Sequence, residues 1–127
     1  MRLTSPTSNT VLLASYVSIY VPGTVDGNQP APELQAKTAR MVMEKMCKFF
    51  GGCTVSKAEG GYILATGELV IEPVVIVKSF GDYEQLEDRM EQVMAIASEV
   101  AETMGQECVS VECNGELNLV SPMKLAA

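Results

Sequence analysis

Six residues bring together the side-chain chemistry that a small-molecule site would need. They are Lys57, Tyr62, Lys78, Ser79, Phe80 and Arg89. A lysine at the end of a strand can hold an anionic ligand while a neighbouring aromatic ring stacks on a base or a sugar. We therefore predict a ligand-binding site at the end of the buried run 74–77, completed by Lys57 and Tyr62 from the preceding hairpin and by Arg89 from a neighbouring copy.

A second observation favours the same place. Phe80 stands just before Gly81-Asp82, where a helix begins, and the backbone amides of a helix N-terminus favour an anion. Two alternatives stay open. In the first, Lys57 and Lys78 are strand-end side chains that extend into solvent and bind nothing. In the second, Phe80 packs back on the following helix as a hydrophobic staple.

The residue types that are missing restrict catalysis. The chain has no histidine, which excludes Ser-His-Asp triads, Cys-His pairs and zinc sites that use histidine. An enzyme would have to use carboxylates, tyrosine, cysteine or a lysine such as Lys78. We therefore predict a binding protein without catalytic residues or a cofactor.

Four cysteines, at positions 47, 53, 108 and 113, lack the spacing of a tight zinc-binding pair. We expect them to be reduced and mostly buried, and we predict no metal site.

Composition and charge narrow the class of protein further. The chain has 127 residues, of which 47% are hydrophobic and 20% charged, as in an ordinary folded domain. A net charge of -7 with nine Lys and Arg argues against binding to duplex nucleic acid. No segment reads as a secretory signal or as a membrane span, so we expect no membrane partner and a cytoplasmic location.

Hydrophobic periodicity and turn residues predict the elements that position these side chains. We expect strands at 12–21, 53–57, 62–65, 68–80, 108–113 and 116–120, with a turn at Ala58-Glu59-Gly60-Gly61 and a bulge or unpaired stretch before Pro73. Helices are expected at 32–50 and from Asp82 to Gly105. Asn114-Gly115 is a strong hairpin signal because both residues tolerate positive φ.

This order predicts an α+β fold with the ferredoxin-like split βαβ arrangement. An antiparallel-rich sheet would carry two helices on one face and extra hairpin strands. The domain should span 11–122, between a disordered tail at 1–10 and a C-terminal tail at 123–127. Tyr16, Ser18, Tyr20, Ser110 and Glu112 should lie on the other face. That partly aromatic face and a surplus of apolar residues on the second helix predict a homo-oligomer.

Several segments resemble a known family when they are taken together. They are Ile19-Tyr20-Val21-Pro22-Gly23-Thr24-Val25, Phe50-Gly51-Gly52-Cys53-Thr54, Gly60-Gly61-Tyr62, the strand 74–80 and the hairpin at Asn114-Gly115. In this order, over roughly residues 16–120, they resemble the phage-encoded Thoeris anti-defence signal-sponge proteins. These motifs are turns and strand ends rather than catalytic signatures.

The resemblance implies a counter-defence protein of a phage or mobile element in the host cell cytoplasm. Such a protein would sequester a cyclic ADP-ribose type of signal, or also cyclic oligonucleotides, without chemistry, as a dimer or a hexamer. The chain departs from what an anionic ligand prefers, because its arginines are only Arg2, Arg40 and Arg89. The alternative function is an acidic phage inhibitor that binds a host defence protein directly through the acidic face of the second helix.

Overall fold

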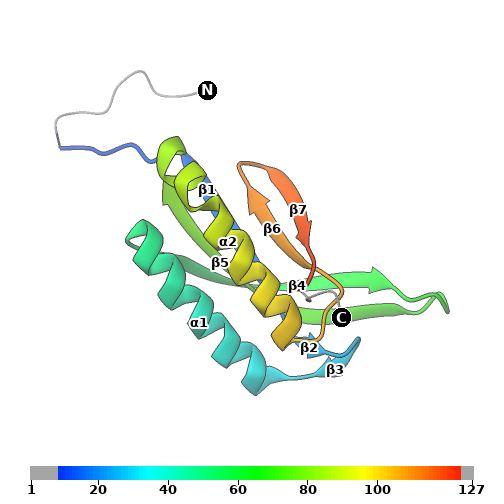
Figure 1. Ribbon diagram of the computed structural model, residues 1–127. Helices are drawn as coiled ribbons and strands as arrows, with labels where there is room; N and C mark the ends of the chain where they lie inside the picture. Colours follow the sequence, from blue (N-terminus) through cyan, green and yellow to red (C-terminus); the bar gives the residue numbers. More distant parts are fainter. Residues whose placement is uncertain (1–8, 124–127) are drawn as a thin grey trace.

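The computed structural model of the chain describes residues 9–123. Its elements follow the predicted order (Figure 1): β1 (Ser15–Pro22), β2 (Thr24–Val25), β3 (Gln29–Pro30), α1 (Pro32–Phe50), β4 (Thr54–Ile63), β5 (Leu69–Gly81), α2 (Tyr83–Thr103), β6 (Val109–Cys113) and β7 (Glu116–Val120). Most of both predicted tails, 1–10 and 123–127, lies outside the described residues.

The sheet confirms the predicted fold class. Five strands pair in the order β4-β5-β1-β6-β7, and every neighbouring pair is antiparallel. Strand β5 lies between β1 and β4, which makes β1-α1-β4 the split βαβ unit of the ferredoxin-like arrangement. Both helices cover the same face of the sheet (Figure 1).

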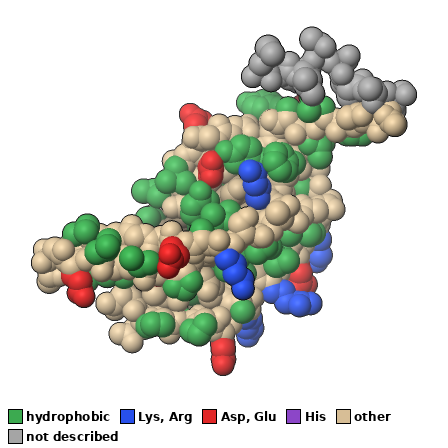
Figure 2. Space-filling view, turned by 180° about the vertical axis from the view of Figure 1, so that it is seen from behind, with side chains coloured by type: hydrophobic (Ala, Val, Ile, Leu, Met, Phe, Trp, Pro, Cys, Tyr) green, Lys and Arg blue, Asp and Glu red, His purple; other side chains and the backbone are tan. Residues whose placement is uncertain are grey.

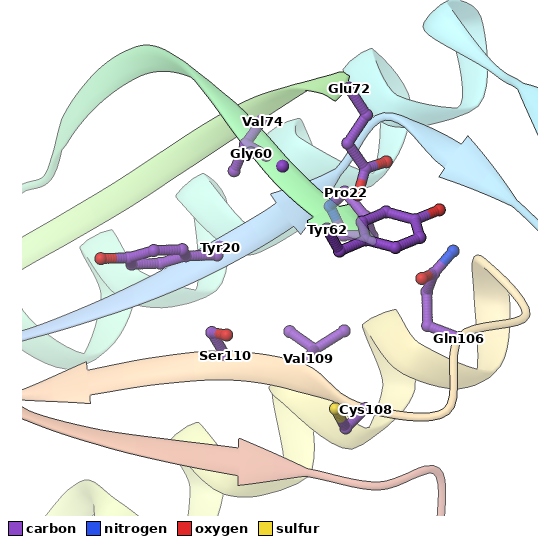
Figure 3. Close-up of a pocket in the computed structure, with 11 residues that line it drawn as sticks. Tyr20, Pro22, Gly60, Tyr62, Glu72, Val74, Gln106, Cys108, Val109 and Ser110 are labelled. Carbon is purple, nitrogen blue, oxygen red and sulfur yellow. The ribbon is translucent and has the colours of Figure 1, made fainter. Parts of the chain in front are cut away.

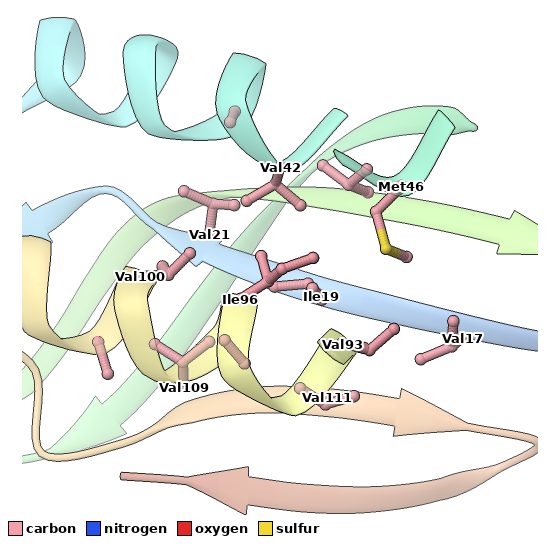
Figure 4. Packing of buried hydrophobic residues seen from close by; sticks show 14 of the residues in the cluster. Val17, Ile19, Val21, Val42, Met46, Val93, Ile96, Val100, Val109 and Val111 are labelled. Carbon is pink, nitrogen blue, oxygen red and sulfur yellow. The ribbon is translucent and has the colours of Figure 1, made fainter. Parts of the chain in front are cut away.

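The core lies between the two helices and the helix-covered face of the sheet (Figure 4). Alternate residues of the central strand, Val17, Ile19 and Val21, are fully buried. They contact a cluster that includes Val42 and Met46 of α1 together with apolar residues of α2 and β6. Because side chains on a strand alternate between faces, the same strand presents Tyr16, Ser18 and Tyr20 to the other side, as predicted.

Both long helices begin and end as the sequence indicates. Helix α1 has proline in its first turn and ends at Gly51, which has the left-handed φ of 89°. Helix α2 is capped by Asp82, whose Oδ1 accepts a hydrogen bond from the backbone N–H of Gln85 at 2.8 Å.

The hairpin between the helices differs from the prediction. Strand β4 runs without interruption from Thr54 to Ile63, so the predicted turn at residues 58–61 is wrong; the chain reverses at 64–68 instead. The predicted bulge before Pro73 does not occur, because β4 and β5 pair there without a break. The predicted unpaired stretch does occur on the other side of β5, where the last pair with β1 is Pro22 and Val74, and proline is tolerated there because it needs no hydrogen-bond acceptor on that side. The two strands therefore extend past the sheet as an arm, residues 59–73 (Figure 1).

The sheet face that the helices leave uncovered is called the open face here. Figure 2 views the molecule from behind and shows hydrophobic side chains on this side and along the arm, with few charged groups between them. Large apolar side chains are exposed here and on the arm: Ile63, Leu69, Ile71, Phe80, Leu117 and Leu119.

The cysteines correct a prediction. All four are free thiols, but Cys47 and Cys108 are exposed and the other two are half-buried. Cys53 and Cys113 pack against the outside of the core without being enclosed by it. No cluster of His, Cys, Asp and Glu able to hold a metal ion occurs within residues 9–123. None of the helices described is long and apolar enough to cross a bilayer.

Candidate functional site

A pocket opens where β1 ends and the arm leaves the body of the sheet (Figure 3). Its volume is about 200 Å³. Strand β1, both strands of the arm, the α2–β6 loop and β6 form its walls through Tyr20, Pro22, Gly60, Gly61, Tyr62, Glu72, Val74, Gln106, Cys108, Val109 and Ser110. Residues far apart in the sequence therefore meet at one end of the open face.

Glu72 is the charged group of this pocket, and the chain fixes its carboxylate. Oε2 accepts a hydrogen bond from Thr24 Oγ1 at 2.7 Å and from the backbone N–H of Gly23 at 3.2 Å. The turn can approach so closely because residue 23 is glycine: a Cβ there would lie 2.3 Å from the carbonyl oxygen of Pro73. A carboxylate held by two donors presents a fixed negative charge.

Tyr62 stands beside Glu72 on the same face of the arm. Its hydroxyl donates a hydrogen bond to the carbonyl oxygen of Gly27, in the β2–β3 turn, at 2.9 Å. The ring keeps 37% of its surface exposed at the mouth of the pocket. An aromatic face next to a carboxylate is an environment that attracts cations.

Gln106 closes the pocket from the α2–β6 loop. Its Nε2 donates to the carbonyl oxygens of Thr24 at 2.8 Å and of Met104 at 3.2 Å. With both amide hydrogens engaged, the side-chain oxygen is left as an acceptor, and Figure 3 shows it turned towards the pocket.

The electrostatic character of the pocket follows from its lining. Glu72 contributes a negative charge, and none of the lining residues is a lysine or an arginine. Pro22, Val74 and Val109 supply apolar surface. Such a pocket suits a ligand with a positive charge and a flat apolar ring system better than it suits a pyrophosphate.

A hydrogen-bonded network adjoins the pocket on the open face. Glu112 accepts hydrogen bonds from Tyr16 Oη at 2.6 Å and from Tyr20 Oη at 2.9 Å. These two bonds outweigh the opposing effect of desolvation and, with a smaller contribution from the charge of Lys78, hold the pKa of the Glu112 carboxyl below its usual value. The same hydrogen bonds, followed by desolvation, raise the pKa of both tyrosines.

The six residues predicted from the sequence do not form one site. Tyr62 lies in the pocket described above. Lys78 and Phe80 lie on the same face but near Tyr16, with Lys78 Nζ 4.2 Å from the Tyr16 ring centroid and 5.0 Å from that of Phe80. Phe80 is 45% exposed there, so the alternative that it packs on the following helix is wrong.

The other three predicted residues lie elsewhere. Ser79 is buried on the helix-covered face and donates a hydrogen bond to the carbonyl oxygen of Gly52 at 2.7 Å. Lys57 pairs with Val75 across the hairpin, which by strand alternation places it on the face opposite to Lys78. Arg89 lies over the ring of Phe49 in its own chain, at 5.0 Å from the centroid.

Sequence reasoning missed most of the pocket. The sequence predicts the correct face for Tyr20 and Ser110 but no ligand contact for either. Glu72 is not among the predicted site residues, although it is the one acid in the otherwise apolar run 69–75. A lone carboxylate in such a strand was the signal available. Its significance depends on Thr24, a partner 48 residues away.

No family model and no curated protein matches the chain. Among the solved structures that do match are a phage SAM lyase in complex with S-methyl-5'-thioadenosine, with a TM-score of 0.67 and 21% identity over 96% of this chain and 100% of that chain, and a phage SAM lyase in the apo state, with a TM-score of 0.60 and 22% identity over 88% and 92%. At these identities the likeness shows a shared fold.

This finding corrects the prediction that the chain is not an enzyme, since structures of a lyase share its fold over most of its length. The prediction relied on the missing histidine. That absence excludes the mechanisms that use an imidazole, but it does not exclude a cleavage that needs no strong base. Neither structure is a signal-sponge protein.

Proposed function

We propose that the chain binds S-adenosylmethionine in the pocket of Tyr62 and Glu72 and cleaves it to S-methyl-5'-thioadenosine. The observation that carries this proposal is the fixed Glu72 carboxylate next to an aromatic ring in a pocket without basic residues. The shared fold of the phage SAM lyase, one structure of which holds S-methyl-5'-thioadenosine, supports the choice of ligand.

The charges of the substrate fit this pocket. S-adenosylmethionine carries a sulfonium and an ammonium group, both positive. Glu72 offers the opposite charge, and the face of Tyr62 attracts a cation through its ring quadrupole. The side-chain oxygen of Gln106, beside Tyr62, is available to accept a hydrogen bond from the ammonium group of the substrate.

The proposed reaction balances without an external reagent. The bond between the sulfonium sulfur and the γ-carbon of the methionyl group breaks, and sulfur keeps the electron pair as neutral S-methyl-5'-thioadenosine. The carboxylate oxygen of the substrate itself bonds to that carbon and closes homoserine lactone. No proton is transferred, so the reaction needs no histidine. Glu72, already hydrogen-bonded on Oε2, acts as a fixed charge that orients the cationic substrate.

Signal sequestration is a separate proposal that the chain's pocket does not favour. A cyclic ADP-ribose ligand carries a pyrophosphate, which is best bound by arginine forks or backbone amides. A calorimetric panel of S-adenosylmethionine, S-methyl-5'-thioadenosine, cyclic ADP-ribose isomers and cyclic oligonucleotides separates the two proposals. The first ligand is cationic and the second is neutral, whereas the others carry phosphates that the carboxylate of Glu72 repels. Binding to a host defence protein predicts no heat with any of them.

The test of the proposed reaction is a turnover assay with a matched control. Purified chain is incubated with S-adenosylmethionine, and S-methyl-5'-thioadenosine and homoserine lactone are measured by liquid chromatography and mass spectrometry. We expect both products in equal amounts, and a rate at least about tenfold lower for Glu72→Gln, since the charge is lost at constant shape. Glu59→Gln removes a carboxylate from the opposite face of the arm and should keep the wild-type rate. Absence of product from the wild type would overturn the proposal.

A further inference from the structure

The carboxylate of Glu112 lies between Tyr16 and Tyr20. Tyr20 lines the pocket and Tyr16 does not. Tyr16 and Tyr20 point to the same face of β1 because they are four residues apart. Glu112 pairs with Ser18, midway between them, and the small serine side chain leaves room for the carboxylate. Each carboxylate oxygen accepts one tyrosine hydroxyl, at 2.6 and 2.9 Å.

The far end of this network is held in place. Lys78 Nζ lies 4.2 Å from the centroid of the Tyr16 ring, and Phe80 packs beside that ring with centroids 6.0 Å apart. Glu112 is therefore held between a packed cation–aromatic cluster and the ring of Tyr20. Its carboxylate is not among the groups that line the pocket.

The near end of the network reaches the ligand pocket. Figure 3 shows the Tyr20 ring along one side of the pocket, with its hydroxyl directed away from the cavity and towards the interior of the open face. An aromatic face at this position can stack on a nucleobase, provided that the ring keeps its orientation. The hydroxyl hydrogen bond to Glu112 is the contact that fixes that orientation.

We propose that Glu112 is a positioning residue for the nucleoside: it holds the Tyr20 ring as a rigid wall on which the adenine stacks. This assignment rests on the proposed function, because it takes the adenine of S-adenosylmethionine or S-methyl-5'-thioadenosine as the base. Glu112 acts through Tyr20 and does not touch the ligand. Its effect should therefore appear in ligand affinity and in KM, with kcat little changed.

The experiment measures the Kd of S-methyl-5'-thioadenosine by calorimetry. Glu112→Ala should bind the nucleoside about tenfold more weakly, because the charged hydrogen bond that holds the Tyr20 ring in place is lost. Glu112→Gln can still accept a hydrogen bond from Tyr20 and should recover part of the affinity. Glu116→Ala, which removes a carboxylate elsewhere on the sheet, is the matched control and should bind like the wild type.

A double-mutant cycle separates positioning from a general structural effect. Tyr20→Phe keeps the ring but removes the hydroxyl, so Glu112→Ala should cause no further loss in that background. Additive losses in the cycle, or an unchanged Kd for Glu112→Ala, would overturn the positioning role while leaving the proposed function intact. If Glu112→Ala does not fold, judged by circular dichroism, Tyr20→Phe and Glu112→Gln decide the matter: a wild-type Kd in both overturns it, and a weakened Kd in Tyr20→Phe supports it.

Failure of the proposed function has a different signature. If the wild type binds neither S-methyl-5'-thioadenosine nor S-adenosylmethionine, the proposed function is overturned and the assignment of Glu112 falls with it.

Discussion

Two groups of side chains carry the chemistry of the open face: Tyr62 and Glu72 in the pocket, and the cluster of Lys78, Phe80 and Tyr16 outside it. The sequence predicts Tyr62 as a ligand-binding aromatic next to a lysine. Tyr62 does line the pocket, but its charged neighbour there is Glu72. Lys78 and Phe80 lie close to each other at the end of β5, outside the pocket, and both contact the ring of Tyr16. The identity of a site depends on contacts such as Thr24 to Glu72, which no local pattern records.

A pH dependence of stability follows from Glu112. Its pKa is lowered in the folded chain by the hydroxyls of Tyr16 and Tyr20 and by Lys78, so below the ordinary carboxyl value the unfolded chain binds more protons than the folded one. The network therefore stabilises the fold above pH of about 4.3 and loses its contribution as the pH falls through the lowered folded value. Urea unfolding between about pH 3 and pH 6 should show a steeper loss of stability for the wild type than for Glu112→Gln. Parallel curves for the two proteins would show that the network has no such effect.

At the scale of elements, the helices were predictable because their signals are local. Proline in the first turn, Asp82 as a cap and Gly51 after the last turn each act within a few residues. The hairpin of β4 and β5 was not predictable in the same way. Gly60 and Gly61 resemble a turn in sequence, but they pair with Glu72 and Ile71 in the middle of two long strands. Pairing with β5 over ten residues outweighs the local preference of two glycines.

Two adjacent glycines at the end of α1 provide a matched test of backbone conformation. Gly51 has φ of 89°, a region that other residues enter only at a cost, whereas Gly52 does not have a positive φ in this range, and a Cβ meets nothing within 4 Å at either position. Gly51→Ala should lower the free energy of unfolding by about 1–2 kcal/mol. Gly52→Ala should change it by less than about 0.5 kcal/mol. Chemical denaturation of both variants measures this, and equal values would contradict the conformational explanation.

At the scale of the whole molecule, the fold class followed from the order of elements, but the distribution of apolar surface did not. Much of the apolar surplus expected on α2 is used inside the monomer, where Ala97, Ala101 and Met104 are fully buried in the core. Exposed apolar side chains lie instead on the arm, at Ile63, Leu69 and Ile71. The pocket, at about 200 Å³, is smaller than the roughly 300–1,000 Å³ of typical ligand sites.

We still predict a homo-oligomer, but the surface that supports this prediction is now the exposed apolar arm rather than α2. Light scattering at micromolar concentration should give a mass at least twice the 13.6 kDa of one chain. Ile71→Lys places a charge on the exposed face of the arm and should shift the mass towards the monomer, while Lys57→Ala, on the same face but nearer the body, should not. A wild-type mass near 13.6 kDa would remove the prediction.

The measurement that tests the central claim most directly is a crystal structure of the chain with S-methyl-5'-thioadenosine. Our account predicts the nucleoside in the pocket, with the adenine against the Tyr20 ring and the thioether end towards Tyr62 and Glu72. Density for the ligand beside Lys78 and Phe80 instead, or an empty pocket at saturating ligand, would contradict it.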